Sequence, residues 1–166
     1  MKKTYRKKRE PFDVTKKYSS YSYATFLLAK RDYSIYKLSS KLKEKGYPQE
    51  DIDATIERMR ELKYLDDERF VTSFVRNKRD GNGWGASKIR QELSMKHGVD
   101  NDLIASVLEE YDFDDAKLKQ YIKKYGVTAP DDSKEYQKRM GFLARKGFSP
   151  KIPSLEELQE YQEINY

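Results

Sequence analysis

The chain has 166 residues, of which 37% are charged and 37% hydrophobic, and its net charge is +6. It contains 14 tyrosines, one histidine (His97) and no cysteine, which excludes disulfides, thiolate zinc sites and cysteine nucleophiles. No stretch approaches the roughly 18 apolar residues of a membrane span, and the basic N-terminus lacks the apolar run of a secretory signal. We therefore expect a cytoplasmic protein without a membrane partner.

The excess positive charge is confined to the first twenty residues. Residues 1–20 contain eight basic and two acidic residues, whereas residues 21–166 contain 26 of each. We expect residues 1–20 to form a basic, flexible tail. In the remainder, residues 69–96 hold seven basic and two acidic residues, while residues 100–115 hold seven acidic residues and no basic one. This segregation predicts one face that attracts phosphate.

One pattern recurs three times along the chain. A helix-length stretch with apolar residues about four apart ends in glycine followed by a hydrophobic residue, at Gly46-Tyr47, Gly98-Val99 and Gly147-Phe148. The glycines follow one another at intervals of 52 and 49 residues, and glycine in this position allows a left-handed helix C-cap. The pattern indicates an internal repeat. We predict an all-α fold of about three tandem three-helix repeats that form an elongated, curved body.

The first repeat is predicted over residues 21–66. A short apolar helix is expected at residues 23–30. Ser34 can cap a second helix that ends at Gly46, and Pro48 suits the first position of a third helix.

The second repeat is predicted over residues 67–111. Its first helix begins at Asp66-Asp67-Glu68 and continues to Gly81. We interpret the acidic run as a helix cap and first turn rather than as a metal site, because no companion ligands accompany it. A second helix follows the glycine-rich turn, and a third begins near Asp100.

The third repeat, over residues 112–153, is predicted to be degenerate. One helix ends at Gly126, and a second carries Tyr136, Met140 and Leu143 on its apolar side.

The last helix of the third repeat is expected to be displaced or lost, because Pro150 and Pro153 fall where the other repeats begin theirs. Ser154 and Glu157 form a capping-box pattern, which predicts a separate acidic helix within residues 154–166. No segment alternates apolar and polar residues, so no strand is expected.

The run Gly81-Asn82-Gly83-Trp84-Gly85 invites comparison with a phosphate-binding loop. No strand precedes it, and the Gly-Lys-Ser/Thr ending of nucleotide-binding loops is missing. We interpret it as a turn between helices in which Trp84 packs on its neighbour, with a partner contact through Trp84 as the alternative. His97 is expected to cap a helix or lie at the surface. Neither an enzyme nor a cofactor is expected, because no catalytic arrangement is recognisable.

The basic residues around Trp84 have two interpretations. They can form a solvated surface on which cations compensate helix dipoles, or an electropositive patch that gives salt-dependent contact with nucleic acid or an acidic protein. We expect Arg76 and Arg79 to lie on a solvated helix end. The candidate partner- or DNA-binding residues are Arg31, Arg76, Lys78, Arg79, Trp84, Lys88, Arg90 and Lys96.

Several motifs occur together in one order over about residues 23–150. In turn they are Arg31-x-Tyr33-Ser34-x3-Leu38-x3-Leu42-x3-Gly46-Tyr47, Leu62-x2-Tyr64-Leu65-Asp66-Asp67-x2-Phe70, Ile89-Arg90-Gln91-Glu92-Leu93 ahead of Gly98-Val99, and Leu143-x-Arg145-Lys146-Gly147-Phe148. This order resembles the RecX family, bacterial regulators of the RecA recombinase. The resemblance implies tandem three-helix units, in agreement with the repeat pattern.

The resemblance also implies a function. It implies a non-enzymatic regulator that binds RecA filaments on single-stranded DNA and limits filament growth, ATP hydrolysis and strand exchange, with a role in DNA repair and homologous recombination. The implied partner is the RecA filament, and direct contact with single-stranded DNA is left open; we expect a monomer. Two alternatives remain: a general single-stranded nucleic-acid binder, and a helical-repeat scaffold for an acidic protein partner.

Overall fold

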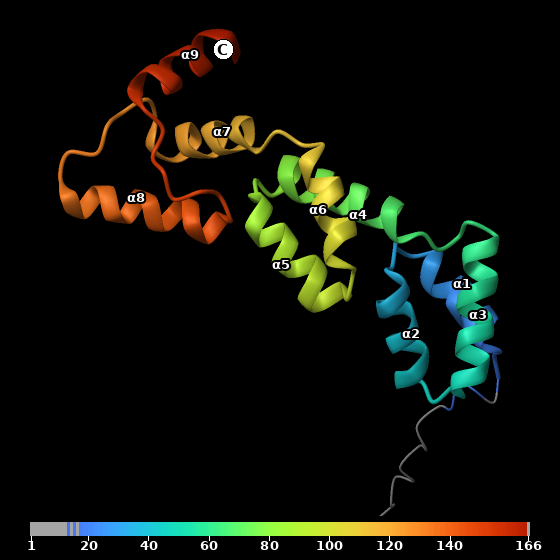
Figure 1. Ribbon diagram of the computed structural model, residues 1–166. Coiled ribbons are helices and arrows are strands. Elements are labelled where there is room, and N and C mark those ends of the chain that lie inside the picture. Colours follow the sequence, from blue (N-terminus) through green and yellow to red (C-terminus); the bar gives the residue numbers. More distant parts are fainter. Residues whose placement is uncertain (1–12, 14, 16, 166) are drawn as a thin grey trace, which may run out of the picture. The chain divides into compact units, whose positions relative to one another are not determined.

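The structure is a computed structural model that describes residues 13, 15 and 17–165, so most of the predicted basic tail lies outside the described residues. Over the described part, the chain is helical and contains no strand, which confirms the predicted all-α class. The elements in chain order are α1 (Ser20–Leu28), α2 (Ile35–Glu44), α3 (Gln49–Glu61), α4 (Asp67–Arg76), a π-helical turn η2 (Asn77–Gly81), α5 (Ala86–His97), α6 (Asn101–Glu109), α7 (Phe113–Tyr125), α8 (Ser133–Lys146) and α9 (Leu155–Asn165) (Figure 1).

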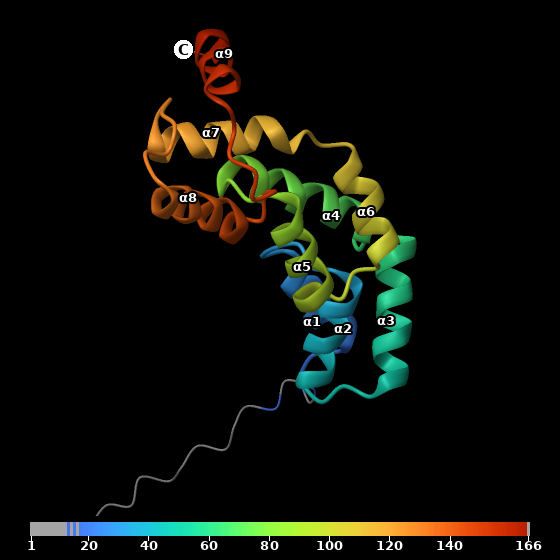
Figure 2. The same cartoon turned by 60° about the vertical axis from the view of Figure 1, so that its left-hand side comes forward.

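The chain divides into two compact units, which we call unit 1 (Met1–Leu65) and unit 2 (Asp66–Tyr166). Unit 1 consists of α1, α2 and α3, which surround one core (Figures 1 and 2). The Ser34 side chain accepts a hydrogen bond from the amide of Lys37 and so caps α2, as predicted. The most deeply buried apolar side chains of this core are Ala24, Leu38, Leu42, Ile52, Met59 and Leu65.

The three repeated glycines all adopt left-handed backbone conformations. Gly46, Gly98 and Gly147 have φ angles of +89°, +60° and +87°. In each case the amide of the following hydrophobic residue donates to the carbonyl of a helix leucine: Tyr47 to Leu42 (3.4 Å), Val99 to Leu93 (3.2 Å) and Phe148 to Leu143 (3.0 Å). The predicted helix-ending caps are therefore confirmed in all three copies.

Unit 2 contains two cores. The first is formed by α4, α5 and α6, and Asp66 caps α4 by accepting from the amide of Arg69 at 3.1 Å, so the acidic run begins a helix as predicted. Helical backbone extends to Gly81, as predicted, but it is not a single α-helix. The α-helix ends at Arg76 and continues as the π-helical turn η2, a form often found at functional sites.

The second core of unit 2 is formed by α7, α8 and α9. The capping box at the start of α9 is present, with Ser154 N donating to Glu157 Oε2 (2.6 Å) and Glu157 N donating to Ser154 Oγ (3.2 Å). The predicted C-terminal helix is present as α9, and it packs on α7, because Leu158 is completely buried in a core to which α7 also contributes. In α8, the expected core residue Tyr136 is 42% exposed, and Arg139 is buried instead.

The two cores of unit 2 meet through backbone atoms. At the C-terminus of α8, the carbonyls of Lys146 and Gly147 accept from the amides of Gly85 (2.8 Å) and Ser87 (3.2 Å) at the start of α5. A Cβ on Gly85 would overlap the Gly147 carbonyl, and one on Gly147 would overlap Lys88. The positive end of one helix dipole thus meets the negative end of another, with glycine on both sides of the contact.

Candidate functional site

Two lysine side chains approach the ring of Trp84. The Lys78 Nζ atom is 4.6 Å and the Lys88 Nζ atom 4.3 Å from the centroid of the indole ring. The π-helical turn positions the ring, because the Trp84 amide donates to the carbonyl of Lys78 at 3.0 Å. Trp84 packs partly buried against the α4–α6 core, as predicted. Both ammonium groups are therefore held at one partly buried ring.

A third lysine approaches the same place from α8. The Lys146 Nζ atom donates to the carbonyl of Asn82 at 3.1 Å, two residues before Trp84. Burial lowers the pKa of Lys146, and the nearby charges of Lys88, Lys123 and Lys124 lower it further. We call Lys78, Lys88, Lys123, Lys124 and Lys146, with Trp84, the Trp84 lysine cluster.

The turn before Trp84 brings the two cores together. Gly83 has a φ angle of +60°, and a Cβ there would collide with the Gln120 side chain of α7. The predicted turn between helices thus contains a left-handed residue at Gly83. On the other side, the Lys124 Nζ atom lies 4.1 Å from the ring centroid of Phe142. The backbone junction and the turn together bring Lys88 of α5 and Lys123 and Lys124 of α7 near Lys146 of α8.

The lysines of the Trp84 lysine cluster have no carboxylate within ion-pair distance in the described part of the chain. Among the ion pairs of the described residues, none involves any of its five lysines. Grouped cations without counter-charges raise the local potential and attract anions. Lysine ammonium groups can neutralise phosphate oxygens as point charges, and they can also face carboxylates. The arrangement therefore gives a positively charged surface, with an aromatic ring beside two of its lysines, whose chemistry suits an anionic ligand.

Sequence reasoning found part of this site. Lys78, Trp84 and Lys88 were candidates and do lie together. It missed Lys123, Lys124 and Lys146, which are distant in sequence and join the cluster only because the third repeat docks on the second. The sequence feature that could have pointed to Lys146 is its position directly before Gly147, the glycine that ends the helix.

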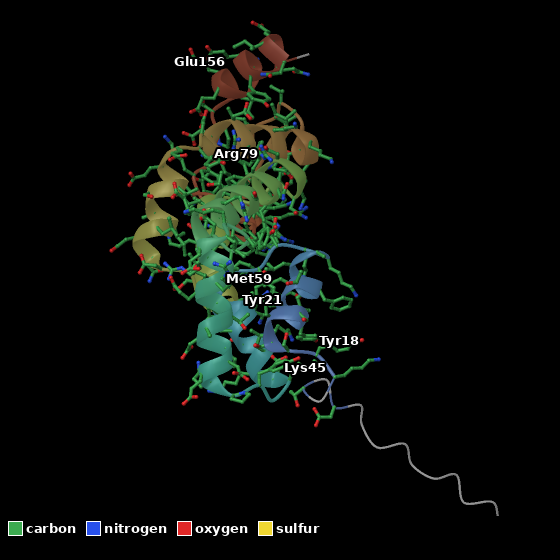
Figure 3. All side chains as sticks on the ribbon, turned by 90° about the vertical axis from the view of Figure 1, so that its right-hand side faces the viewer. Tyr18, Tyr21, Lys45, Met59, Arg79 and Glu156 are labelled. Carbon is green, nitrogen blue, oxygen red and sulfur yellow. The ribbon has the colours of Figure 1, made fainter. Side chains whose placement is uncertain are left out.

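Arg79 does not have the expected environment. Its side chain is only 19% exposed, its Nε donates to the carbonyl of Asp112 at 2.7 Å, and its Nη1 lies 3.1 Å from Asp80 Oδ1 (Figure 3 labels Arg79). The guanidinium also lies 5.7 Å from the ring centroid of Tyr111. The expectation that Arg79 shares a solvated helix end with Arg76 is therefore wrong. Arg76 is exposed, whereas Arg79 donates a hydrogen bond to the first residue of repeat 3.

The remaining candidate residues lie outside the cluster. Lys96 pairs with Glu92 at 2.8 Å, and Arg90 is exposed two residues after Lys88, on another side of α5. Arg31 belongs to unit 1, where its guanidinium lies 4.6 Å from the ring centroid of Tyr33.

His97 is neither a simple cap nor a surface residue. Its ring lies 5.1 Å, centroid to centroid, from each of Phe70 and Phe74 of α4. The residue is partly buried, so it contributes aromatic packing to the first core of unit 2.

Comparison with protein families gives three consecutive matches. Residues 21–59 match the model described as RecX, first three-helix domain; residues 66–108 match RecX, second three-helix domain; and residues 110–152 match RecX, third three-helix domain. These matches confirm the predicted series of tandem three-helix units.

Curated relatives and solved structures agree with the family matches. The chain is similar to the regulatory protein RecX of Vibrio parahaemolyticus serotype O3:K6 (40% identity, covering 79% of this chain and 84% of the relative) and of Legionella pneumophila strain Corby (37% identity, 85% and 92%). Its fold is similar to the crystal structure of RecX from Lactobacillus salivarius, with a TM-score of 0.68 at 19% identity over 92% of this chain and 96% of the other. No helix in the described residues has both the length and the apolar character needed to cross a bilayer.

Proposed function

This chain belongs to the RecX family, which consists of regulatory proteins rather than enzymes, and from this premise we propose that it binds the RecA filament on single-stranded DNA. In this proposal, binding limits filament growth, ATP hydrolysis and strand exchange. The protein acts as a monomer in the cytoplasm, and its contact surface spans repeats 2 and 3, which we take as residues 67–111 and 112–153.

The observation that carries the proposal is the Trp84 lysine cluster. A filament on DNA presents phosphates at regular intervals, and five lysines without carboxylate partners in the described part of the chain supply complementary charge. We propose that these lysines contact DNA phosphates directly, while the Trp84 ring provides an apolar contact at the centre. Contact of this kind depends little on base sequence and weakens as salt rises.

The proposal is tested with DNA-dependent ATP hydrolysis by the cognate RecA. Addition of the wild-type protein should lower the steady-state rate. The triple variant Lys78→Gln, Lys88→Gln, Lys146→Gln should require at least about tenfold more protein for the same inhibition, because each lost phosphate contact weakens binding. A matched control replaces three exposed lysines of unit 2, Lys119, Lys134 and Lys138, by glutamine.

Two results would contradict the proposal. An unchanged ATPase rate with wild-type protein would remove the filament as its target. Equal loss of inhibition in the cluster variant and in the control variant would show that total charge, and not this surface, matters. Pull-down of an acidic protein from nuclease-treated extract that depends on the same lysines would favour the scaffold alternative.

A further inference from the structure

The exposed large aromatic side chains of unit 1 are concentrated in and beside α1 and α2. Tyr18, Tyr21, Phe26 and Tyr36 are 44%, 37%, 52% and 55% exposed. Tyr18 and Tyr21, labelled in Figure 3, come from the residues around the start of α1. We call these four side chains the exposed aromatic set. They lie outside the Trp84 lysine cluster, which belongs to unit 2.

The outer side of α1 has a distinctive composition. Successive residues of an α-helix are rotated by about 100°, so Tyr21 and Phe26 fall on either side of the exposed part of α1. The exposed residues between them are small: Ser22, Thr25 and Ala29. The rings are therefore separated by a strip without bulky side chains, and the Phe26 ring also stacks on Tyr23, with centroids 6.2 Å apart.

Cations accompany these rings. The Lys30 Nζ atom lies 4.1 Å from the ring centroid of Phe26, and the Lys17 Nζ atom lies 5.4 Å from that of Tyr18. Residues 17–45 contain seven basic and two acidic residues, and one of the acidic residues, Glu44, is paired with Lys41 at 2.6 Å. By contrast, α3 in the same unit contains five acidic and two basic residues. Within residues 17–65, the net positive charge is thus carried by the segment that exposes the aromatic rings.

We propose that the exposed aromatic set is a surface on which bases of single-stranded DNA stack, while the surrounding cations neutralise its phosphates. Aromatic rings beside a basic surface are how proteins hold single strands without sequence preference. An exposed cation–π contact is weaker than stacking of a base, so Lys30 can leave the Phe26 ring for a phosphate when a base arrives. Lysine is depleted at protein–protein interfaces, which favours nucleic acid over a protein as the occupant.

This inference rests on the proposed function only in the choice of polymer, since the proposed filament forms on single-stranded DNA. The chemistry of the two surfaces differs. The Trp84 lysine cluster would require phosphates, whereas the exposed aromatic set requires bases. The two requirements can be separated in the absence of any recombinase.

The test measures binding of the full chain to two labelled strands by fluorescence anisotropy: an oligothymidylate and an abasic strand with the same number of phosphates. Wild-type protein should prefer the strand with bases. The double variant Tyr21→Ala, Phe26→Ala should bind the oligothymidylate about ten- to hundredfold more weakly, and its affinity for the abasic strand should not change. A matched control is Tyr64→Ala, which removes a 57% exposed tyrosine of the same unit beyond the acidic α3.

Equal wild-type affinity for both strands would overturn the inference, as would an equal effect of Tyr64→Ala. Competition by polyglutamate as strong as that by oligothymidylate would identify an acidic protein as the occupant instead. Circular dichroism confirms that each variant is folded. A preference for bases in a protein that leaves RecA ATPase unchanged would contradict the proposed function and leave this inference intact.

Discussion

Repeats 2 and 3 fill the same core position in opposite ways. Four residues before the last leucine of its middle helix, repeat 2 has Ile89, whereas repeat 3 has Arg139. Both side chains are buried, with exposed fractions of 0% and 4%. Repeat 1 resembles repeat 2, with Leu38 at this position. One backbone arrangement thus accommodates either an aliphatic side chain or a guanidinium, provided that the guanidinium has partners.

The partners of Arg139 are all within repeat 3. Nη1 donates to Tyr121 Oη (2.9 Å) and to the Thr128 carbonyl (2.6 Å), and Nη2 donates to Glu135 Oε1 (2.8 Å). These hydrogen bonds outweigh burial and raise the pKa of Arg139, so it stays charged. The network joins α7, α8 and the loop between them. In repeat 3 the buried Arg139 guanidinium thus stands where the other repeats have aliphatic packing. Its hydrogen bonds also hold the loop between α7 and α8 in place.

The largest effect should follow from Arg139→Ala. The substitution leaves a cavity and unpaired acceptors, and we expect a loss of about 3–5 kcal/mol in the free energy of unfolding of unit 2. Urea titration followed by the fluorescence of Trp84, the single tryptophan, measures it. Arg139→Leu, which introduces the residue type of repeat 1, should cost less. If the free energy of unfolding falls equally in both variants, the hydrogen bonds of Arg139, and not the volume of its side chain, determine the stability of this core.

Leu93→Ala tests the aliphatic repeat in the same assay. Leu93 is fully buried in the α4–α6 core, and we expect a loss of about 2–5 kcal/mol from lost burial and the cavity that remains. Met95→Ala is the control, since Met95 is 74% exposed on the same helix and should have little effect. A loss below about 1 kcal/mol for Leu93→Ala would mean that this core collapses around the cavity.

Gly147→Ala tests the junction that joins the two repeats. Its φ of +87° and its contact with Lys88 oppose a side chain, and we expect a loss of about 1–3 kcal/mol. Hydrogen exchange at the Gly85 and Ser87 amides should accelerate. Gly46→Ala is the matched control, because Gly46 has a similar φ of +89° but, among the described residues, no atom closer than 4.0 Å to the added Cβ. Exchange that stays slow in Gly147→Ala would show that the junction adapts.

The smallest effect is expected from pH. Hydrogen bonds from Arg139 and then from the Asp131 amide lower the pKa of Glu135 below its ordinary value of 4.5. A lowered folded-state pKa gives stability that is present above the unfolded value and is lost as pH falls through the folded value. The stability difference between wild type and Glu135→Gln should therefore shrink from pH 7 towards pH 3. A difference that does not vary with pH would show that the Glu135 charge is not used.

The sequence predicted what local chemistry determines. The glycine caps, the Ser34 and Asp66 caps and the capping box before α9 each depend on a few adjacent residues, and all are present. The burial of Arg139 was not predicted. An arginine at an apolar position of the repeat is expected to be exposed, and its burial depends on hydrogen bonds to Tyr121 and Glu135 that the sequence pattern does not indicate.

The sequence predicted only those residues of the candidate site that belong to repeat 2. Lys78, Trp84 and Lys88 are close in sequence, whereas Lys146 joins them through the docking of α8 on α5. Arg79 was misjudged for the same reason, since its partner carbonyl at Asp112 lies 33 residues away. Long-range contacts of this kind leave no periodic signal in the sequence.

The main-chain joint between α8 and α5 has an evolutionary consequence. Its hydrogen bonds use carbonyls and amides that every non-proline residue carries, so the joint depends on two glycines and not on a complementary set of side chains. Descendants of this sequence can therefore exchange neighbouring side chains, including the lysines of the Trp84 lysine cluster, and keep the hydrogen bonds of this joint. Surface side chains can therefore diverge between descendants while the backbone joint between α8 and α5 stays the same.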